Sequence, residues 1–245
     1  MQRAGALAQA PAAVLFDLDG TYADTAADMG AALNALLARH GRSPLPASEI
    51  RPHVSSGARG LLGAGFGLAP DAPRYAELRA EYLALYAADI CRHTRPFDGM
   101  EALTAALLAQ GLCWGIVTNK PSWLTEPLLA AMAPAPPPAC VVSGDTAARP
   151  KPYPDPLLHA CALLDLEPAR CWYVGDDARD IVAGRAAGMA TLAAGWGYLG
   201  TGAPPEDWGA DGIAAHPLAV LDWLRRGPRS APAVVEPAPS PVGSA

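Results

Sequence analysis

The stretch that decides the fold is Val14-Leu15-Phe16-Asp17-Leu18-Asp19-Gly20-Thr21. The apolar run from 12 to 16 has the length and composition typical of a strand buried on both faces of a parallel sheet. Because successive side chains of an extended chain point to opposite faces, Asp17 and Asp19 project to the same side. They lie at the carboxyl end of the strand, where open parallel sheets bind their ligands. The stretch therefore predicts a ligand site at this strand end.

Two carboxylates this close repel each other unless a cation, a shared proton or both offset the repulsion. One of them can then stay ionised, as a nucleophile or metal ligand, while the other carries a proton. This pairing is suited to splitting a phosphate ester. The alternative is a strand that ends in an acidic turn, since Asp and Gly are common turn residues. The motifs that follow along the chain favour the first interpretation.

The overall composition is that of a protein that forms a hydrophobic core. The 245 residues include 51% hydrophobic and 17% charged residues, which argues against disorder and allows one domain with a sizeable insertion. The formal net charge of -6 and the lack of a basic run argue against nucleic-acid binding. No apolar segment approaches the length of a membrane span, so we expect no membrane association.

The two terminal segments and the cysteines predict disordered tails and a reducing cytoplasmic environment. We expect residues 1–11 to be a disordered tail, because no long apolar segment precedes the signal-like Ala8-Gln9-Ala10. Residues 227–245, rich in Pro and Ala, are also expected to be disordered. The five cysteines are odd in number and lack a Cys-x-x-Cys spacing, which predicts buried thiols in a reducing cytoplasm.

The periodicity of the chain predicts an α/β fold with a Rossmann-like parallel-sheet core and helices on both faces. Residues 12–25 and 93–226 form this core, and residues 26–92, which show helical periodicity and no convincing strand, form an inserted all-helical unit. The later strands are expected at 112–117, 140–142, 171–174, 189–193 and 213–214.

Polar side chains gather at four of the expected strand ends, which open on one edge of a parallel sheet and can therefore converge. They are Asp17 with Asp19, Thr118 with Asn119, Lys151, and Asp176 with Asp177 and Asp180.

Only two of the 18 cationic residues are lysines, and both lie near these strand ends. A chain that otherwise uses Arg has reason to keep Lys where a compact ammonium is needed. Lys120 follows Thr118 and Asn119 but points the other way along an extended chain. We therefore expect Lys151, and not Lys120, to act in the site.

The four motifs, in their order, resemble those of the haloacid dehalogenase-like phosphatases. The matching stretches are Asp-Leu-Asp-Gly-Thr, Val-Thr-Asn-Lys-Pro, Lys-Pro-x-Pro-Asp-Pro and Val-Gly-Asp-Asp-x-x-Asp-Ile, and the resemblance covers roughly residues 12–222. The helical unit after the first motif is similar to the cap of the phosphoglycolate phosphatase branch. The segments 55–59, 114–121 and 208–211 look closer to N-acetylmuramic acid 6-phosphate phosphatases.

The resemblance implies a Mg²⁺-dependent phosphatase in which Asp17 attacks phosphorus and forms an aspartyl-phosphate. Asp19 would protonate the leaving alkoxide and then take a proton from the hydrolytic water. Mg²⁺ would be held by the Asp17 carboxylate, the Asp19 main-chain carbonyl and Asp176. Lys151 would neutralise charge in the transition state. The phosphoryl oxygens would be held by Thr118 and by groups at Asn119 and Gly20.

Several of these residues also have a simpler structural interpretation. Thr118 and Asn119 could cap the next helix. Asp180 lies in a first helical turn, where an acid is favourable in any case, and it could orient Lys151 or the metal waters. Asp177 is equally compatible with a metal-water contact and with a helix cap.

Two residues of less certain role stand near the motifs. Tyr22 replaces the aliphatic residue usual in the family after Gly-Thr, and could pack in the hinge or narrow the site. Arg59 could contact the non-phosphate end of the substrate, but a surface position is slightly favoured.

Other activities fit the motifs less well. A dehalogenase would not need Asp19 as proton donor, a phosphomutase is not excluded, and a response-regulator phosphoacceptor is disfavoured by the helical insertion. The expected partner is a small phosphorylated metabolite with a carboxylate or sugar leaving group, and the chain is expected to be a monomer or homodimer. Phosphoglycolate is the general expectation, and N-acetylmuramic acid 6-phosphate is the alternative.

Overall fold

A parallel sheet of six strands forms the centre of the computed structural model, which describes residues 10–227. The predicted tails fall almost entirely on residues 1–9 and 228–245, which lie outside the described residues. All neighbouring strands run parallel, in the order β5-β4-β1-β6-β7-β8. This arrangement confirms the predicted α/β fold. The strands are β1 (Ala13–Phe16), β4 (Cys113–Val117), β5 (Cys140–Val142), β6 (Cys171–Gly175), β7 (Ala190–Ala194) and β8 (Gly212–Ala214).

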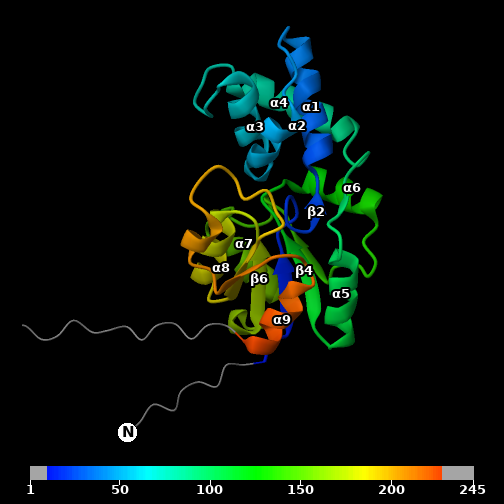
Figure 1. Cartoon of the computed structure of the whole chain (residues 1–245), viewed down its shortest axis with the longest axis vertical. Coiled ribbons are helices and arrows are strands. Elements are labelled where there is room, and N and C mark those ends of the chain that lie inside the picture. The colour runs from blue at the N-terminus through cyan, green and yellow to red at the C-terminus, as the bar shows by residue number, and fades with distance from the viewer. Residues whose placement is uncertain (1–9, 228–245) are drawn as a thin grey trace, which may run out of the picture.

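Helices cover both faces of this sheet (Figure 1). Val14 and Phe16 of β1 point to the face covered by α5 (Met100–Ala109) and α9 (Ala219–Arg226). Ala13 and Leu15 point to the opposite face, covered by α7 (Asp155–Leu164) and α8 (Ala178–Ala186). β1 is therefore apolar on both faces, as its sequence predicts. Helix α6 (Ser122–Met132) and the short 3-10 helices Pro168–Arg170 and Pro205–Trp208 complete this part.

Residues 26–88 form the helical insertion, which lies beyond one end of the sheet in Figure 1. It consists of α1 (Ala26–Arg39), α2 (Ala47–Ile50), a 3-10 helix (Arg51–Ser56), α3 (Gly57–Phe66) and α4 (Tyr75–Ala88). These helices share a hydrophobic core of their own, which also takes in Leu124 and Tyr198 from outside the insertion. Helix α4 contributes Tyr75, Leu78, Tyr82 and Tyr86 to this core.

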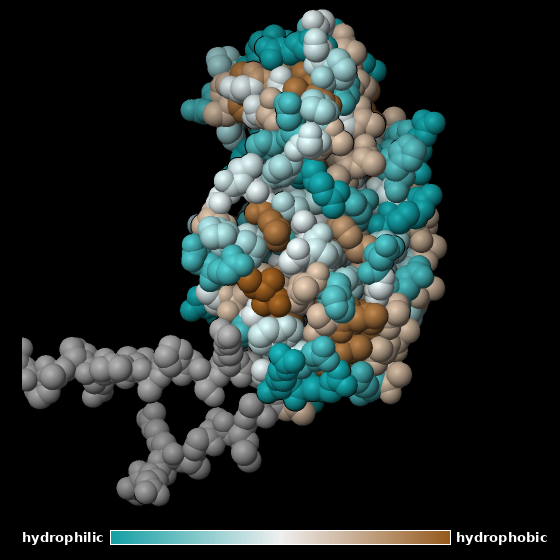
Figure 2. Space-filling model, in the orientation of Figure 1, coloured by the Kyte–Doolittle hydropathy of each residue, from teal (hydrophilic) through white to brown (hydrophobic). Residues whose placement is uncertain are grey.

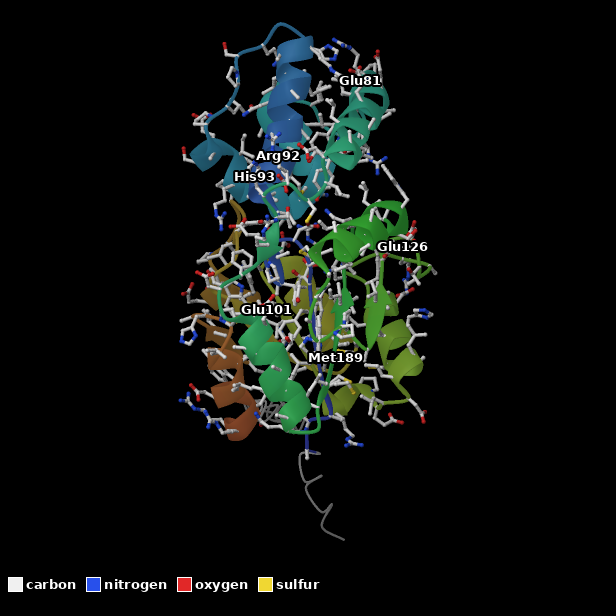
Figure 3. All side chains as sticks on the ribbon, turned by 90° about the vertical axis from the view of Figure 1, so that its right-hand side faces the viewer. Glu81, Arg92, His93, Glu101, Glu126 and Met189 are labelled. Atoms are coloured by element: carbon white, nitrogen blue, oxygen red, sulfur yellow. The ribbon has the colours of Figure 1, made fainter. Side chains whose placement is uncertain are left out.

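The chain crosses twice between the sheet-containing part and the helical insertion, and the two crossing segments pair with each other. Strand β2 (Ala23–Asp24) is antiparallel to β3 (Arg95–Pro96). The Asp28 carboxylate accepts hydrogen bonds from the backbone N–H groups of His93 and Thr94 and from the Thr94 hydroxyl, at 2.7–3.0 Å. His93 lies at this junction in Figure 3. These two-residue strands are too short for any sequence periodicity to predict.

Tyr22 packs into the core instead of narrowing the site. Its ring stacks on that of Trp114, with centroids 5.1 Å apart and planes 12° apart. Its carbonyl accepts a hydrogen bond from the Phe97 backbone N–H at 3.0 Å, next to the paired passages. The aromatic residue after Gly20-Thr21 thus fixes the base of the hinge.

The described part of the chain contains no helix long and apolar enough to cross a membrane. On the face seen in Figure 2, hydrophobic residues form small groups scattered between hydrophilic ones. All five cysteines are free thiols, and Cys140, Cys161 and Cys171 are buried.

Candidate active site

A cavity of about 230 Å³ lies between the carboxyl ends of the strands and the helical insertion. Asp17, Asp19, Thr118, Asn119 and Lys151 line it from the sheet side. The insertion contributes the segment 54–59 and residues of α4. The structure thus brings strand ends that are more than 130 residues apart in sequence to one cavity.

Asp17 lies directly after β1, and its backbone N–H donates to the Val174 carbonyl at 3.0 Å. Its carboxylate forms an ion pair with Lys151 Nζ at 2.9 Å and accepts a hydrogen bond from the Leu18 N–H at 2.7 Å. Burial raises the pKa of Asp17 to about 6, and the nearby charge of Lys151 offsets only part of this effect. Asp17 is therefore mostly ionised at neutral pH, and a further positive charge beside it would favour the ionised form still more.

Lys151 is the central cation of the site, with only 1% of its side chain exposed. Its ammonium also contacts Asp180 Oδ1 at 2.7 Å, Tyr173 Oη at 2.7 Å and the Val117 carbonyl at 3.0 Å. Burial acts to lower the pKa of Lys151, but the charges of Asp17 and Asp180 outweigh it, and the pKa is raised. Lys151 therefore remains charged, and Asp180 orients it.

Asn119 holds the loop that carries Lys151. Its side-chain amide donates to the Lys151 carbonyl, and its amide oxygen accepts from the Lys151 N–H, both at 2.9 Å. Because both ends of the amide bind the Lys151 backbone, the Asn119 side chain positions the loop that carries Lys151.

Asp176 follows β6 and is fully buried. It accepts hydrogen bonds from the Thr21 hydroxyl at 2.9 Å, from the Ser55 hydroxyl at 2.6 Å and from the Tyr198 N–H at 3.0 Å. Burial, followed by the charges of Asp17 and Asp180, raises the pKa of Asp176 to about 7.

The backbone at Gly20 packs directly against Asp176. Gly20 has φ +91°, and a Cβ there would lie 2.2 Å from Asp176 Oδ2. Only glycine fits this position, both for its backbone conformation and for the close approach. Gly20 thus makes room for the carboxylate, whether or not it also contacts phosphate.

Asp17, Asp176 and Asp180 each place a carboxylate oxygen within 4.8 Å of the others. Asp180 is engaged by Lys151 and by the Asp177 N–H, and Asp176 accepts three hydrogen bonds, whereas both contacts of Asp17 fall on Oδ1 and leave its Oδ2 for a ligand. An all-oxygen donor set, in which the charge of Asp180 raises the pKa of both Asp17 and Asp176, fits a hard divalent cation such as Mg²⁺.

Asp19 reaches the same cavity two residues after Asp17. Its Oδ1 accepts hydrogen bonds from the Thr25 hydroxyl at 2.7 Å and from Lys120 Nζ at 2.9 Å. The prediction that Lys120 points away was therefore wrong. Strand β4 ends at Val117, and beyond it the chain turns into α6, so the alternation of an extended strand no longer applies.

Thr118 is buried at the end of β4, and its N–H donates to the Val142 carbonyl at 2.9 Å. Its hydroxyl accepts from the Lys120 N–H at 3.1 Å and faces the cavity. The next helix begins at Ser122, so Thr118 is not its cap.

Asp177 caps α8 instead of facing the cavity. It accepts from the Arg179 N–H at 3.0 Å, and Asp180 accepts from the Asp177 N–H at 3.1 Å, which completes a capping box. Asp177 also forms an ion pair with the Arg179 guanidinium. Burial opposes its ionisation, but the hydrogen bond and charge of Arg179 lower the pKa of Asp177.

Sequence reasoning missed several contacts that the helical insertion and the later loops supply. The Arg179 guanidinium donates to the Ser55 carbonyl at 3.0 Å, which joins α8 to the insertion. Ser55 and Tyr198 lie in Gly-containing turns that were visible in the sequence, but no periodicity places a loop in space. Arg59 is exposed, as favoured, yet it lines the cavity together with Arg79.

Comparisons with known proteins are consistent with this geometry. Residues 14–194 match the model of the haloacid dehalogenase-like hydrolases. The chain is 44% identical over 214 residues to the N-acetylmuramic acid 6-phosphate phosphatase of Pseudomonas aeruginosa, with 87% of this chain and 95% of that protein covered. It is 43% identical over 207 residues to a phosphoglycolate phosphatase of Xylella fastidiosa, with 84% and 90% covered. The crystal structure of a predicted phosphoglycolate phosphatase from Haemophilus somnus shares the fold, with a TM-score of 0.77, 24% identity, and 87% and 98% coverage.

Proposed function

Because this chain belongs to the haloacid dehalogenase-like hydrolases, we propose that it is a Mg²⁺-dependent phosphatase that acts on a small phosphomonoester through an aspartyl-phosphate. The observation that carries this proposal is the position of Asp17. Its carboxylate lines the cavity, between a buried lysine and the buried Asp176. A carboxylate in this place is accessible to a substrate and is held in one orientation.

In the first step the Asp17 carboxylate attacks phosphorus, and the bond to the leaving oxygen breaks. Lys151 stabilises the charge that gathers on the phosphoryl oxygens, while Asn119 and Asp180 keep the ammonium in place. Thr118 offers its hydroxyl to a phosphoryl oxygen. Asp19 donates a proton to the leaving alkoxide, which therefore departs as a neutral alcohol.

In the second step water attacks the aspartyl-phosphate, and Asp19 takes up the proton of that water. This step restores the Asp17 carboxylate and the protonated Asp19, and it releases inorganic phosphate.

Asp17, Asp176 and the Asp19 main-chain carbonyl are the groups we propose to hold Mg²⁺, with Asp180 and Asp177 in supporting positions. The bound ion would supply the positive charge that shields phosphate from the carboxylates. We also propose that the helical insertion serves as a cap, since it closes the cavity and contacts Asp176 through Ser55.

The substrate we propose is 2-phosphoglycolate. Relatives named phosphoglycolate phosphatase align with most of this chain. In addition, Arg59 and Arg79 of the helical insertion line the cavity. Two guanidinium groups facing the leaving group suit a carboxylate. N-acetylmuramic acid 6-phosphate is the second candidate. It also carries a carboxylate, and the relative that is 44% identical is named as a phosphatase of this compound. The free thiols suit a cytoplasmic location.

The test is a panel of phosphomonoesters with Mg²⁺ and with EDTA, for the parent protein and for Asp17→Asn. We expect Mg²⁺-dependent release of phosphate that the substitution abolishes. Release by the variant at the parental rate would refute the role of Asp17. The ratio of kcat/KM for 2-phosphoglycolate to that for N-acetylmuramic acid 6-phosphate then decides between the two substrates.

A further inference from the structure

Lys120 is the second buried cation of the cavity, and the reaction described above gives it no task. Only 5% of its side chain is exposed, and its ammonium lies 2.9 Å from Asp19 Oδ1. Asp19 is the only carboxylate within ion-pair distance of Lys120 among residues 10–227. Lys120 is thus buried close to a strand end and paired with one acid. This arrangement indicates that the role of Lys120 depends on Asp19.

The backbone of Lys120 is fixed on both sides. Its N–H donates to the Thr118 hydroxyl at 3.1 Å, and its carbonyl accepts from the Gly144 N–H at 2.8 Å and from the Thr125 hydroxyl at 3.1 Å. The ammonium is therefore presented to Asp19 from a rigid base, which a residue that orients another side chain requires.

The two donors to Asp19 contact the same carboxylate oxygen. Lys120 and the Thr25 hydroxyl both donate to Oδ1, and within the described part of the chain no hydrogen bond reaches Oδ2. Oδ1 is thus held as an acceptor, and Oδ2 is the oxygen left to carry the proton toward a leaving group. This arrangement fixes both the rotamer of Asp19 and the position of its proton.

The same ammonium also reaches the helical insertion. It lies 3.3 Å from Tyr86 Oη and 4.7 Å from the centre of the Tyr86 ring, and Tyr86 belongs to α4. Lys120 therefore joins the proposed proton donor to the part of the molecule that closes over the cavity.

We propose that Lys120 is a positioning residue for the proton donor: it holds Asp19 Oδ1, leaves Oδ2 for the leaving-group oxygen, and is itself steadied by Tyr86 when the insertion covers the cavity. This inference rests on the proposed phosphatase function. It predicts a defect in proton donation, and not in binding of the phosphoryl group.

The test uses two substrates of nearly equal shape, p-nitrophenyl phosphate and phenyl phosphate, together with glycerol 2-phosphate. Nitrophenolate leaves without a proton, whereas phenolate and above all an alkoxide need one. The constant kcat/KM reports the steps up to release of the alcohol, so it excludes the later hydrolysis of the aspartyl-phosphate. For Lys120→Met we expect kcat/KM to fall roughly 10- to 100-fold for glycerol 2-phosphate, less for phenyl phosphate, and about 3-fold or less for p-nitrophenyl phosphate.

Two variants on α4 form a matched pair. Tyr86→Phe removes only the hydroxyl near Lys120, and we expect a smaller change in the same order of substrates. Tyr82→Phe removes a hydroxyl that contacts the Met29 carbonyl, and we expect no change in the ratios. If Lys120→Met does not fold, Tyr86→Phe still tests the proposal. Inhibition of each variant by inorganic phosphate checks that the phosphoryl-binding site is intact.

An equal loss for all three substrates would overturn the proposal, because it would indicate a structural role or a contact with the phosphoryl group. Unchanged kinetics in Lys120→Met would overturn it as well. If the parent protein hydrolyses no phosphomonoester, 2-phosphoglycolate and N-acetylmuramic acid 6-phosphate included, the proposed function itself fails, which is a separate outcome.

Discussion

Replacing Lys151 by Met removes the cation from a cluster of buried acids while nearly preserving the length and volume of the side chain. The ammonium contacts four oxygens at 2.7–3.0 Å, two of them from Asp17 and Asp180. Removing one partner of a buried ion pair leaves an uncompensated charge, which costs about 3–5 kcal/mol. We therefore expect the free energy of unfolding to fall by about this amount at pH 8 in EDTA.

The same change removes the charge that we propose to stabilise the phosphoryl group in the transition state. We expect kcat for p-nitrophenyl phosphate with saturating Mg²⁺ to fall by about 10²–10³, the range for loss of one preorganised electrostatic contact. Urea unfolding followed by circular dichroism measures the first effect, and steady-state kinetics measure the second.

Arg149→Met is the matched control for this experiment. Arg149 lies two residues away and pairs with Asp155 at 2.9 Å, but 57% of its side chain is exposed, so its loss should be silent in both assays. The loss of stability in Lys151→Met should also shrink toward pH 5, where protons neutralise the unpaired acids. Equal and small losses for both variants, at either pH, would refute the reasoning.

Three further predictions concern the metal site and the hinge. The pKa values of Asp17 and Asp176, about 6 and about 7 against an ordinary 3.8, mean that the metal-free folded state binds more protons than the unfolded state between pH 4 and 7. Without metal, the urea concentration at the midpoint of unfolding should therefore be lower at pH 8 than at pH 5. Mg²⁺ should raise this concentration more at pH 8 than at pH 5. A metal-free midpoint that rises with pH would contradict this. Gly197→Ala would place a Cβ 2.2 Å from Asp176, so the Mg²⁺ concentration for half-maximal activity should rise 10-fold or more, whereas Gly202→Ala, with open space around it, should leave it unchanged. Tyr22→Ala should lower the free energy of unfolding by about 3–5 kcal/mol, measured in urea, because it empties a stacked aromatic site; a loss below 1 kcal/mol would show that the site collapses without cost.

The strand ends that line the cavity could be predicted because two local rules place them. Strand alternation puts Asp17 and Asp19 on one side, and parallel strands bring their carboxyl ends to one edge. Thr118 and Asp176 follow from the same rules, whereas Lys151 reaches the cavity from a loop beyond β5 that Asn119 holds in place. The structure agrees with these rules wherever a strand is still extended.

The errors and omissions begin where the strands end. Lys120 was assigned the wrong direction because alternation was carried three residues beyond Val117. Ser55 reaches Asp176 from a 3-10 helix of the insertion, and Tyr198 reaches it from a loop. Arg179, at the start of α8, contacts the Ser55 carbonyl, so these positions depend on how the insertion packs on the sheet. Such contacts are tertiary, so no pattern within a short window of sequence reports them.

The paired passages at β2 and β3 mean that the insertion enters and leaves the sheet-containing part at neighbouring points. A segment grafted in this way can be exchanged for another of different length without altering strand order or the acids beneath it. The hydrophobic core of the insertion is built largely from its own helices, so it would be exchanged together with the insertion. Substrate choice and phosphorus chemistry can thus evolve, or be engineered, as separate modules of one chain.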